Sequence, residues 1–134
     1  MRWKPFIHRL NQVIQGRRGN PWGVAEKTRL GDREVRICLP DVPVAGRRCV
    51  LVDDVASTAR TLAGATTQLL QAGAAAVDVL VTHALFVGDA EDTLRQSGAD
   101  RLVSTNSIKH TSNALDLAPL LAASIAGELR RAQS

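Results

Sequence analysis

The sequence is poor in aromatic residues and in cysteine. Phe, Trp and Tyr together make up 3% of the 134 residues, and Tyr is absent. The core must therefore be aliphatic, and a surface that stacks nucleic-acid bases on aromatic side chains is disfavoured. The two cysteines, Cys38 and Cys49, cannot form a disulfide framework. We therefore expect a cytoplasmic protein with reduced thiols.

Long apolar runs are also missing. No run approaches the roughly 18 apolar residues that cross a bilayer, and the first residues, MRWKP, lack the apolar centre of a secretory signal. The hydrophobic share of 45% and the charged share of 22% are typical of a soluble globular protein. The length is that of one domain. We therefore expect a single domain over residues 1–134 that does not bind a membrane.

Positive charge is concentrated at the start of the chain. Residues 1–48 carry eleven Lys or Arg against four Asp or Glu, whereas residues 49–134 carry six against nine. A basic segment of this kind is compatible with nucleic acid, with phosphorylated small molecules, or with a solvated surface. The scarcity of aromatic side chains argues against nucleic acid, and charge alone does not choose between the other two.

The second half of the chain alternates between strand and helix patterns. We expect strands at residues 48–52, 77–82 and 101–105, and helices at residues 61–73, at residues 90–96 and after an N-cap at Asp116. The last helix is expected to bury its large apolar side chains, namely Leu117, Leu120, Leu121, Ile125 and Leu129. This order predicts an α/β fold of three layers, with a mainly parallel sheet covered on both faces. Ligands of such sheets bind at the carboxyl ends of the strands.

The first half of the chain is less regular. Residues 4–16 favour a helix, and residues 22–25 favour a short strand. A turn at residues 30–32 separates two arms, residues 26–29 and 33–39, which predicts a projecting β-hairpin. Pro40 and Pro43 then exclude a further regular element before residue 48.

The strongest motif is residues 49–61, CVLVDDVASTART. It places two carboxylates, Asp53 and Asp54, at the end of a buried strand, and a hydroxyl-rich loop and a helix N-terminus follow. Backbone N–H groups of such a loop, with the helix dipole behind them, bind phosphate. Adjacent carboxylates accept hydrogen bonds from neighbouring sugar hydroxyls. A sugar 5-phosphate satisfies both halves of the motif.

This segment resembles the PRPP-binding motif of type I phosphoribosyltransferases and of ribose-phosphate pyrophosphokinases. The family pattern is an apolar strand, Asp-Asp, two variable residues and Asp-Thr-Gly-Gly-Thr. This chain departs from it by having Ser57 for Asp and Ala59 and Arg60 for the two Gly. The resemblance implies a type I phosphoribosyltransferase fold in which Asp53 and Asp54 bind the ribose hydroxyls. It also implies that the 5-phosphate lies on Ser57, Thr58, Ala59, Arg60 and Thr61.

Other segments resemble the pyrophosphokinase branch. Residues 82–90, THALFVGDA, are similar to its Thr-His-Gly-Leu-Phe-x-Gly-x-Ala stretch, and residues 103–108, VSTNSI, to its Val-x-Thr-Asp-Thr-Ile. Residues 26–29, EKTR, resemble the Asp-Lys-x-Arg of its mobile catalytic loop. The resemblance implies that Lys27 and Arg29 stabilise the pyrophosphoryl group as it moves from ATP to ribose 5-phosphate with Mg²⁺, giving PRPP and AMP. Arg offers a fork for phosphate oxygens and Lys a mobile point charge.

The resemblance covers about residues 21–127 and matches only the C-terminal half of a pyrophosphokinase. The N-terminal half, with most of the ATP contacts, has no counterpart, and residues 1–20 match nothing. We therefore expect the ribose-5-phosphate-binding half of such an enzyme, as a homo-oligomer or paired with an N-terminal half. Two alternatives stay open: a phosphoribosyltransferase that consumes PRPP, and a non-catalytic module that binds sugar phosphate or associates with synthetase subunits. The motif does not identify metal ligands.

Overall fold

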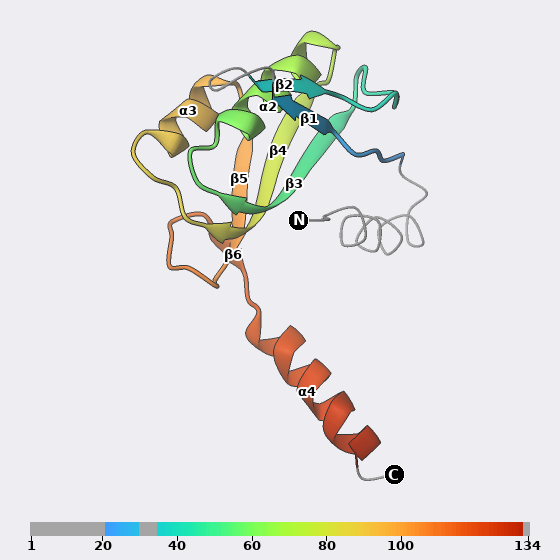
Figure 1. Cartoon of the computed structure of the whole chain (residues 1–134), viewed down its shortest axis with the longest axis vertical. Helices are drawn as coiled ribbons and strands as arrows, with labels where there is room; N and C mark the ends of the chain where they lie inside the picture. Colours follow the sequence, from blue (N-terminus) through green and yellow to red (C-terminus); the bar gives the residue numbers. More distant parts are fainter. Residues whose placement is uncertain (1–20, 30–34, 133–134) are drawn as a thin grey trace.

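The computed structural model describes residues 21–29 and 35–132. The helix expected over residues 4–16 and the hairpin turn at residues 30–32 lie outside these ranges. Figure 1 shows the arrangement of the described elements. In chain order they are β1 (Glu26–Arg29), β2 (Val35–Cys38), β3 (Arg48–Ala56), α2 (Arg60–Gln71), β4 (Ala76–Ala84), α3 (Ala90–Gln96), β5 (Arg101–Thr105), β6 (Asn113–Leu115) and α4 (Ala118–Ala132).

A four-stranded parallel sheet forms the centre of the structure. Its order is β3-β4-β5-β6, so each strand lies beside the next strand in the sequence. Helix α2 connects β3 to β4, and α3 connects β4 to β5, as parallel pairing requires. The α/β class and the mainly parallel sheet are therefore confirmed. The short strand β6 was not predicted, because three residues beginning with Asn113 carry no strand pattern.

The two arms of the predicted hairpin are confirmed. β1 and β2 pair antiparallel, from Glu26 opposite Cys38 to Arg29 opposite Val35. The strand expected at residues 22–25 is wrong, since this segment is irregular. Gly23 lies so close to Pro40 that an added Cβ would stand 2.3 Å from the proline Cβ. Because proline has no N–H, this neighbour cannot donate a ladder hydrogen bond to the segment.

The core lies on one face of the sheet. Val77, Val79 and Val81 of β4 are fully buried. Val79 and Val81 pack with Leu62 of α2 and Leu94 of α3, and Val77 packs with Leu69 of α2. Successive strand residues face opposite sides, so α2 and α3 cover the same face. On the opposite face, Val52, Leu80 and Val103 lie in register, and Val50 lies beside Asp78. Of these, Val50 is 56% exposed.

The expected burial of the last helix is wrong. Leu120, Leu121, Ile125 and Leu129 of α4 are 56–64% exposed, and α4 contacts no other described element. Figure 1 shows α4 extending away from the sheet beyond β6. The described residues therefore form two layers, without the third that the sequence led us to expect. No helix within these ranges is long and apolar enough to cross a membrane.

Hydrogen bonds at the start of α4 explain its direction. The side-chain amide of Asn106 donates to Asp116 Oδ1 at 2.9 Å, and the Leu117 N–H donates to Asn106 Oδ1 at 3.0 Å. The Ala118 N–H also donates to Asp116 Oδ1, as expected of an N-terminal capping carboxylate. These bonds anchor the start of α4 to the end of β5, so that the helix continues past the strands instead of folding back.

A charged cluster joins the other ends of three strands. The carboxylate of Asp78 in β4 accepts hydrogen bonds from Arg48 of β3 at 2.8 Å and from Arg101 of β5 at 2.6 Å. Its side chain is 8% exposed, whereas the two arginine side chains are 48% and 64% exposed. Chiefly through its hydrogen bond to Arg101, the cluster lowers the pKa of Asp78 despite the opposing effect of burial.

Asp78→Asn should lower the free energy of unfolding at neutral pH by about 1–3 kcal/mol, because a buried charged acceptor of two hydrogen bonds is lost. The folded pKa of Asp78 is lowered, so its stabilisation is full above the unfolded pKa and is lost as the pH falls through the folded pKa. The variant should therefore lose less stability than the parent protein below about pH 4. Urea unfolding at several pH values, with the exposed-site variant Asp41→Asn as control, measures this. Equal acid sensitivity in Asp78→Asn and the parent would contradict it.

Candidate functional site

The two acidic residues of the motif lie within the last part of β3. The strand was expected to end before Asp53, but it continues to Ala56 because Val55 and Ala56 still pair with His83 and Ala84 of β4. Successive residues of a strand point to opposite faces, so Asp53 lies on the helix-covered face and Asp54 on the open one. The Asp54 N–H donates to Asp53 Oδ1 at 2.9 Å. Both side chains are half-buried.

The loop after β3 turns its carbonyl groups toward the β4–α3 connection. Ala56 O accepts the N–H of Phe86 at 2.9 Å, and Ser57 O accepts the N–H of Val87 at 3.0 Å. Within the described part of the chain, the backbone N–H groups of residues 57–60 donate to no other group. Ser57 and Thr58 are also exposed. The start of α2 therefore presents N–H and hydroxyl donors at the carboxyl edge of the sheet.

Ala59 shapes this loop. It is the N-cap of α2 with φ 59° and ψ 3°, and it is the one non-glycine residue with positive φ in the described ranges. This left-handed conformation costs an L-residue roughly 1–2 kcal/mol, and glycine avoids the cost. Ala59 is 5% exposed and packs in the core with α2 and β4. Ala59 thus adopts the conformation for which the family pattern has Gly.

Helix α2 begins at Arg60, one residue earlier than expected, and it ends before Gly73, which has φ 91°. The expected glycine stop is therefore confirmed. The Arg60 side chain is exposed, and the first turn of α2 contains no acidic residue. A positive charge and a helix N-terminus act in the same direction on an anion.

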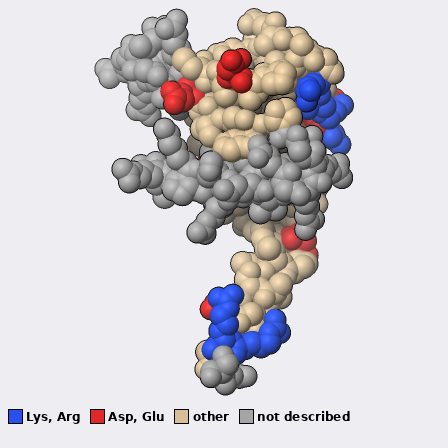
Figure 2. Space-filling view, turned by 90° about the vertical axis from the view of Figure 1, so that its right-hand side faces the viewer, with Lys and Arg blue, Asp and Glu red and all other residues tan. Residues whose placement is uncertain are grey.

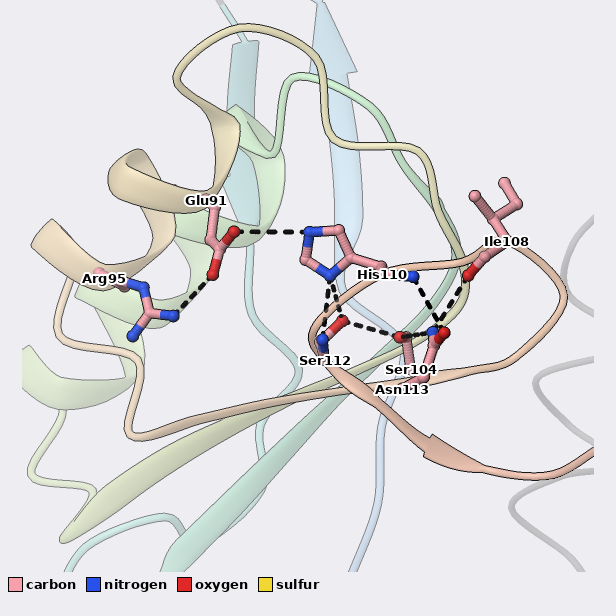
Figure 3. A network of polar contacts seen from close by, with 7 residues as sticks. All are labelled: Glu91, Arg95, Ser104, Ile108, His110, Ser112 and Asn113. Atoms are coloured by element: carbon pink, nitrogen blue, oxygen red, sulfur yellow. Dashed lines mark hydrogen bonds and ion pairs between the residues drawn. The ribbon is translucent and has the colours of Figure 1, made fainter.

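A second loop at this edge is held by a polar network (Figure 3). His110 Nδ1 lies 2.7 Å from Ser112 Oγ and accepts the Ser112 N–H at 3.1 Å. Since Nδ1 is an acceptor, the ring proton is on Nε2, which faces Glu91 Oε2 of α3 at 3.4 Å. Arg95 donates to the other oxygen of Glu91 at 2.6 Å, and it is the main reason why the pKa of Glu91 is lowered.

Asn113 continues the network into β5. Its side-chain amide donates to Ser104 Oγ, to the carbonyl of Thr105 and to the carbonyl of Ile108. The loop between β5 and β6 is thereby joined to α3. His83 of β4 also contacts this loop, through Ser107 Oγ at 2.8 Å. Sequence reasoning missed the network because its members come from separate elements and have no motif spacing.

Lys27 and Arg29 lie in β1, and their side chains are outside the described part of the chain. The hairpin reaches α2 through β2, where Ile37 is buried and its Cδ1 would stand 3.0 Å from a Cβ added at Gly64. The structure thus brings the hairpin to the helix that follows the candidate phosphate loop. It describes no contact between Lys27 or Arg29 and residues 57–61.

Asp53 and Asp54 are also the residues that could hold a magnesium ion. Mg²⁺ sites often use one or two protein carboxylates together with substrate phosphates, and because Asp53 and Asp54 point to opposite faces of the sheet, either one would supply a single carboxylate. Within the ranges that the structure describes, no group of three or more His, Cys, Asp or Glu side chains could hold a metal ion by itself. A magnesium ion at this edge would therefore depend on ligands from a bound phosphate compound.

Comparison with known proteins places this geometry in a family. A family model described as the phosphoribosyl synthetase-associated domain matches residues 38–130. A ribose-phosphate pyrophosphokinase of Chromobacterium violaceum is 42% identical over 86 residues, which are 64% of this chain and 26% of the relative. One from Aeropyrum pernix is 36% identical over 104 residues, which are 78% of this chain and 33% of the relative.

A solved structure agrees with these sequences. The crystal structure of phosphoribosylpyrophosphate synthetase from Mycobacterium smegmatis superposes with a TM-score of 0.66 at 27% identity, over 92% of this chain and 42% of that one. This chain spans about a quarter to a third of the length of the two curated relatives. The family model, the sequence relatives and the fold together show that the chain belongs to the ribose-phosphate pyrophosphokinase family, and that it corresponds to part of the length of these relatives.

Proposed function

We propose that the chain is the ribose-5-phosphate-binding part of a ribose-phosphate pyrophosphokinase. The observation that carries this proposal is the set of backbone N–H groups at residues 57–60, which have no acceptor within the described part of the chain. They lie at the start of α2 and directly follow the strand that carries Asp53 and Asp54. N–H groups and carboxylates in this order suit a ligand with a phosphate at one end and hydroxyls at the other.

In the proposed reaction, the β,γ-pyrophosphoryl group of ATP moves to the 1-hydroxyl of ribose 5-phosphate, giving PRPP and AMP. Such transfers depend mainly on positioning and on neutralising charge. Asp53 and Asp54 orient the sugar through its hydroxyls, and residues 57–61 bind its 5-phosphate. Lys27 and Arg29 of the hairpin stabilise the transferring group. Mg²⁺, when bound, would neutralise phosphate charge beside Asp53 and Asp54.

A non-catalytic module that binds sugar phosphate or associates with synthetase subunits is the second candidate. Two observations favour it: the departures from the family pattern at Ser57, Ala59 and Arg60, and the short span of the chain relative to its relatives. A phosphoribosyltransferase is less well supported, since the relatives named above are pyrophosphokinases.

Calorimetry and an assay for AMP test the proposal. The 134-residue chain should bind ribose 5-phosphate, and by itself it should form little or no AMP from ATP and ribose 5-phosphate, because it spans about a quarter of a pyrophosphokinase. Failure to bind ribose 5-phosphate would overturn the proposed site. Rapid AMP formation by the chain alone would contradict the assignment to a partial site, and consumption of PRPP with a nucleobase would favour the phosphoribosyltransferase.

Arg60→Gly should leave the affinity for ribose 5-phosphate unchanged or weaken it. The exposed guanidinium adds positive charge at the first residue of α2, and a dianionic phosphate is attracted to it. Calorimetric titration measures the change, and Arg47→Gly, at an exposed position before β3, is the control. Much tighter phosphate binding by Arg60→Gly would show that Arg60 blocks the loop, and the non-catalytic module would then be the better candidate.

A further inference from the structure

His83 lies at the carboxyl end of β4, next to the residues of the proposed site. In the register of the two parallel strands it pairs with Val55, which is two residues after Asp53 on β3. Neighbouring strands lie about 4.8 Å apart. Shortly after His83, the N–H groups of Phe86 and Val87 bond to the end of β3 and the start of the phosphate loop. His83 therefore lies beside the part of β3 that joins the carboxylates to that loop, at the edge where such sheets bind ligands.

Hydrogen bonds decide which nitrogen of the His83 ring carries the proton. The Ser107 hydroxyl donates its single proton to the carbonyl of Thr82 at 2.9 Å. Ser107 Oγ can therefore only accept from His83 Nδ1, which lies 2.8 Å away. In the neutral ring the proton is then on Nδ1, and Nε2 is a hydrogen-bond acceptor. Thr105 holds Ser107 in place, because its Oγ1 also donates to the Thr82 carbonyl and accepts the Ser107 N–H.

The acceptor on His83 has no partner in the described part of the chain. Nε2 makes no hydrogen bond or ion pair there, and the side chain is half-buried. His110, the other described histidine, uses both ring nitrogens, since Nδ1 bonds to Ser112 and Nε2 faces Glu91. His83 is thus held in one orientation through one nitrogen and offers the other to a ligand.

Charged groups elsewhere on the described surface do not serve this edge. The ion pairs of Asp78 lie at the opposite ends of the strands. Figure 2 shows basic side chains at the free end of α4, where Arg130 and Arg131 lie in the last turn, and 15 helical residues place that end about 22 Å from the start of the helix. The proposed site itself supplies anionic acceptors and N–H donors. His83 adds an uncharged acceptor, which suits a hydroxyl group, because a dianionic phosphate has no proton to donate.

We propose that His83 is a further substrate-binding residue of this site, and that its Nε2 accepts a hydrogen bond from a hydroxyl of ribose 5-phosphate. The inference rests on the proposed function, and it makes Ser107 the positioning residue that keeps the ring proton on Nδ1. Because the acceptor is fixed before the ligand binds, little side-chain freedom is lost when the hydrogen bond forms. Inorganic phosphate has no sugar hydroxyl, so its binding to the loop should not involve His83.

Nitrogen NMR of the histidine rings tests the proposal on the isotope-labelled chain at about pH 8, where an ordinary histidine is neutral. Nδ1 of His83 should resonate as a protonated nitrogen and Nε2 as an unprotonated one, and His83→Gln identifies both signals by their loss. Ribose 5-phosphate should shift the Nε2 signal toward the protonated position, whereas inorganic phosphate should leave it unchanged. In Ser107→Ala the two nitrogen signals should become more alike, because the bond that selects the tautomer is gone.

Two substitutions of His83 separate the roles of its nitrogens. The side-chain amide of His83→Asn takes the place of Nδ1 and keeps a donor for Ser107, but it leaves no group at the place of Nε2. The amide of His83→Gln reaches the place of Nε2 and offers an acceptor there. In calorimetry, His83→Asn should weaken ribose 5-phosphate binding about two- to tenfold, the contribution of one hydrogen bond between uncharged groups. His83→Gln should stay close to the parent, and neither variant should alter the binding of inorganic phosphate.

The outcomes separate this inference from the proposed function. If the parent protein binds ribose 5-phosphate without a shift of the Nε2 signal, the proposed function stands and the role of His83 is overturned. The same holds if His83→Asn binds as tightly as the parent, since the Ser107 contact alone would then matter, or if inorganic phosphate shifts Nε2. An unchanged tautomer in Ser107→Ala removes Ser107 from its role. If the parent does not bind ribose 5-phosphate, the proposed function fails and the role of His83 with it. The NMR test uses the parent protein, so it decides the matter even where a variant does not fold.

Discussion

Asp54→Asn should weaken the binding of ribose 5-phosphate between about tenfold and about a hundredfold. Hydrogen bonds to a charged acceptor contribute about 1.5–3 kcal/mol, and asparagine keeps the shape of the side chain but not its charge. Within the described part of the chain, the carboxylate of Asp54 accepts no hydrogen bond, so both of its oxygens can receive ribose hydroxyls. Isothermal titration calorimetry of the purified variant measures the change.

Two further variants make this result specific. Asp53→Asn should also weaken binding, and it additionally alters the acceptor of the Asp54 N–H. Asp92→Asn, at an exposed position on α3, removes the same charge away from the loop and should leave the affinity unchanged. An unchanged affinity in the Asp53→Asn, Asp54→Asn double variant, with the fold intact, would remove these residues from the site.

Local patterns predicted most of the sheet and of its connections. Helix α2 could be predicted because Leu62, Ala65 and Leu69 recur at helical spacing and Gly73 follows the helix. The hairpin could be predicted from its turn and its two arms. These features depend on residues that are close in the sequence, so a single chain carries the information.

Features that depend on distant contacts could not be predicted. The length of β3 is set by continued pairing with His83 and Ala84, and it determines that Asp53 and Asp54 face opposite sides of the sheet. The exposure of α4 follows from the side chain of Asn106, which lies more than ten residues before the helix. An apolar stripe indicates that a helix needs a partner, but it does not say where that partner is.

Ala59→Val should destabilise the fold by about 2–4 kcal/mol, the sum of backbone strain and overpacking. Ala59 has φ 59°, a conformation that β-branched residues rarely adopt, and its side chain is 5% exposed. Binding of ribose 5-phosphate should be lost as well, because relaxing the strain would turn the N–H groups of residues 57–60 away from a common anion. Urea unfolding and calorimetry measure the two effects.

Two control variants separate backbone strain from packing. Ala63→Val lies in the same core cluster, at 8% exposure on α2, and should cost only the overpacking part, about 1–3 kcal/mol. Ala59→Gly relieves the left-handed strain. It also loses a buried methyl group, which costs about 0.8 kcal/mol of stability, and it makes the unfolded chain more flexible, which costs about 0.4–1 kcal/mol. These effects nearly cancel, so its stability should stay close to that of the parent, with ribose 5-phosphate binding equal or tighter. If Ala59→Val and Ala63→Val proved equally stable and both bound ligand, the left-handed turn at residue 59 would not be what shapes the phosphate loop.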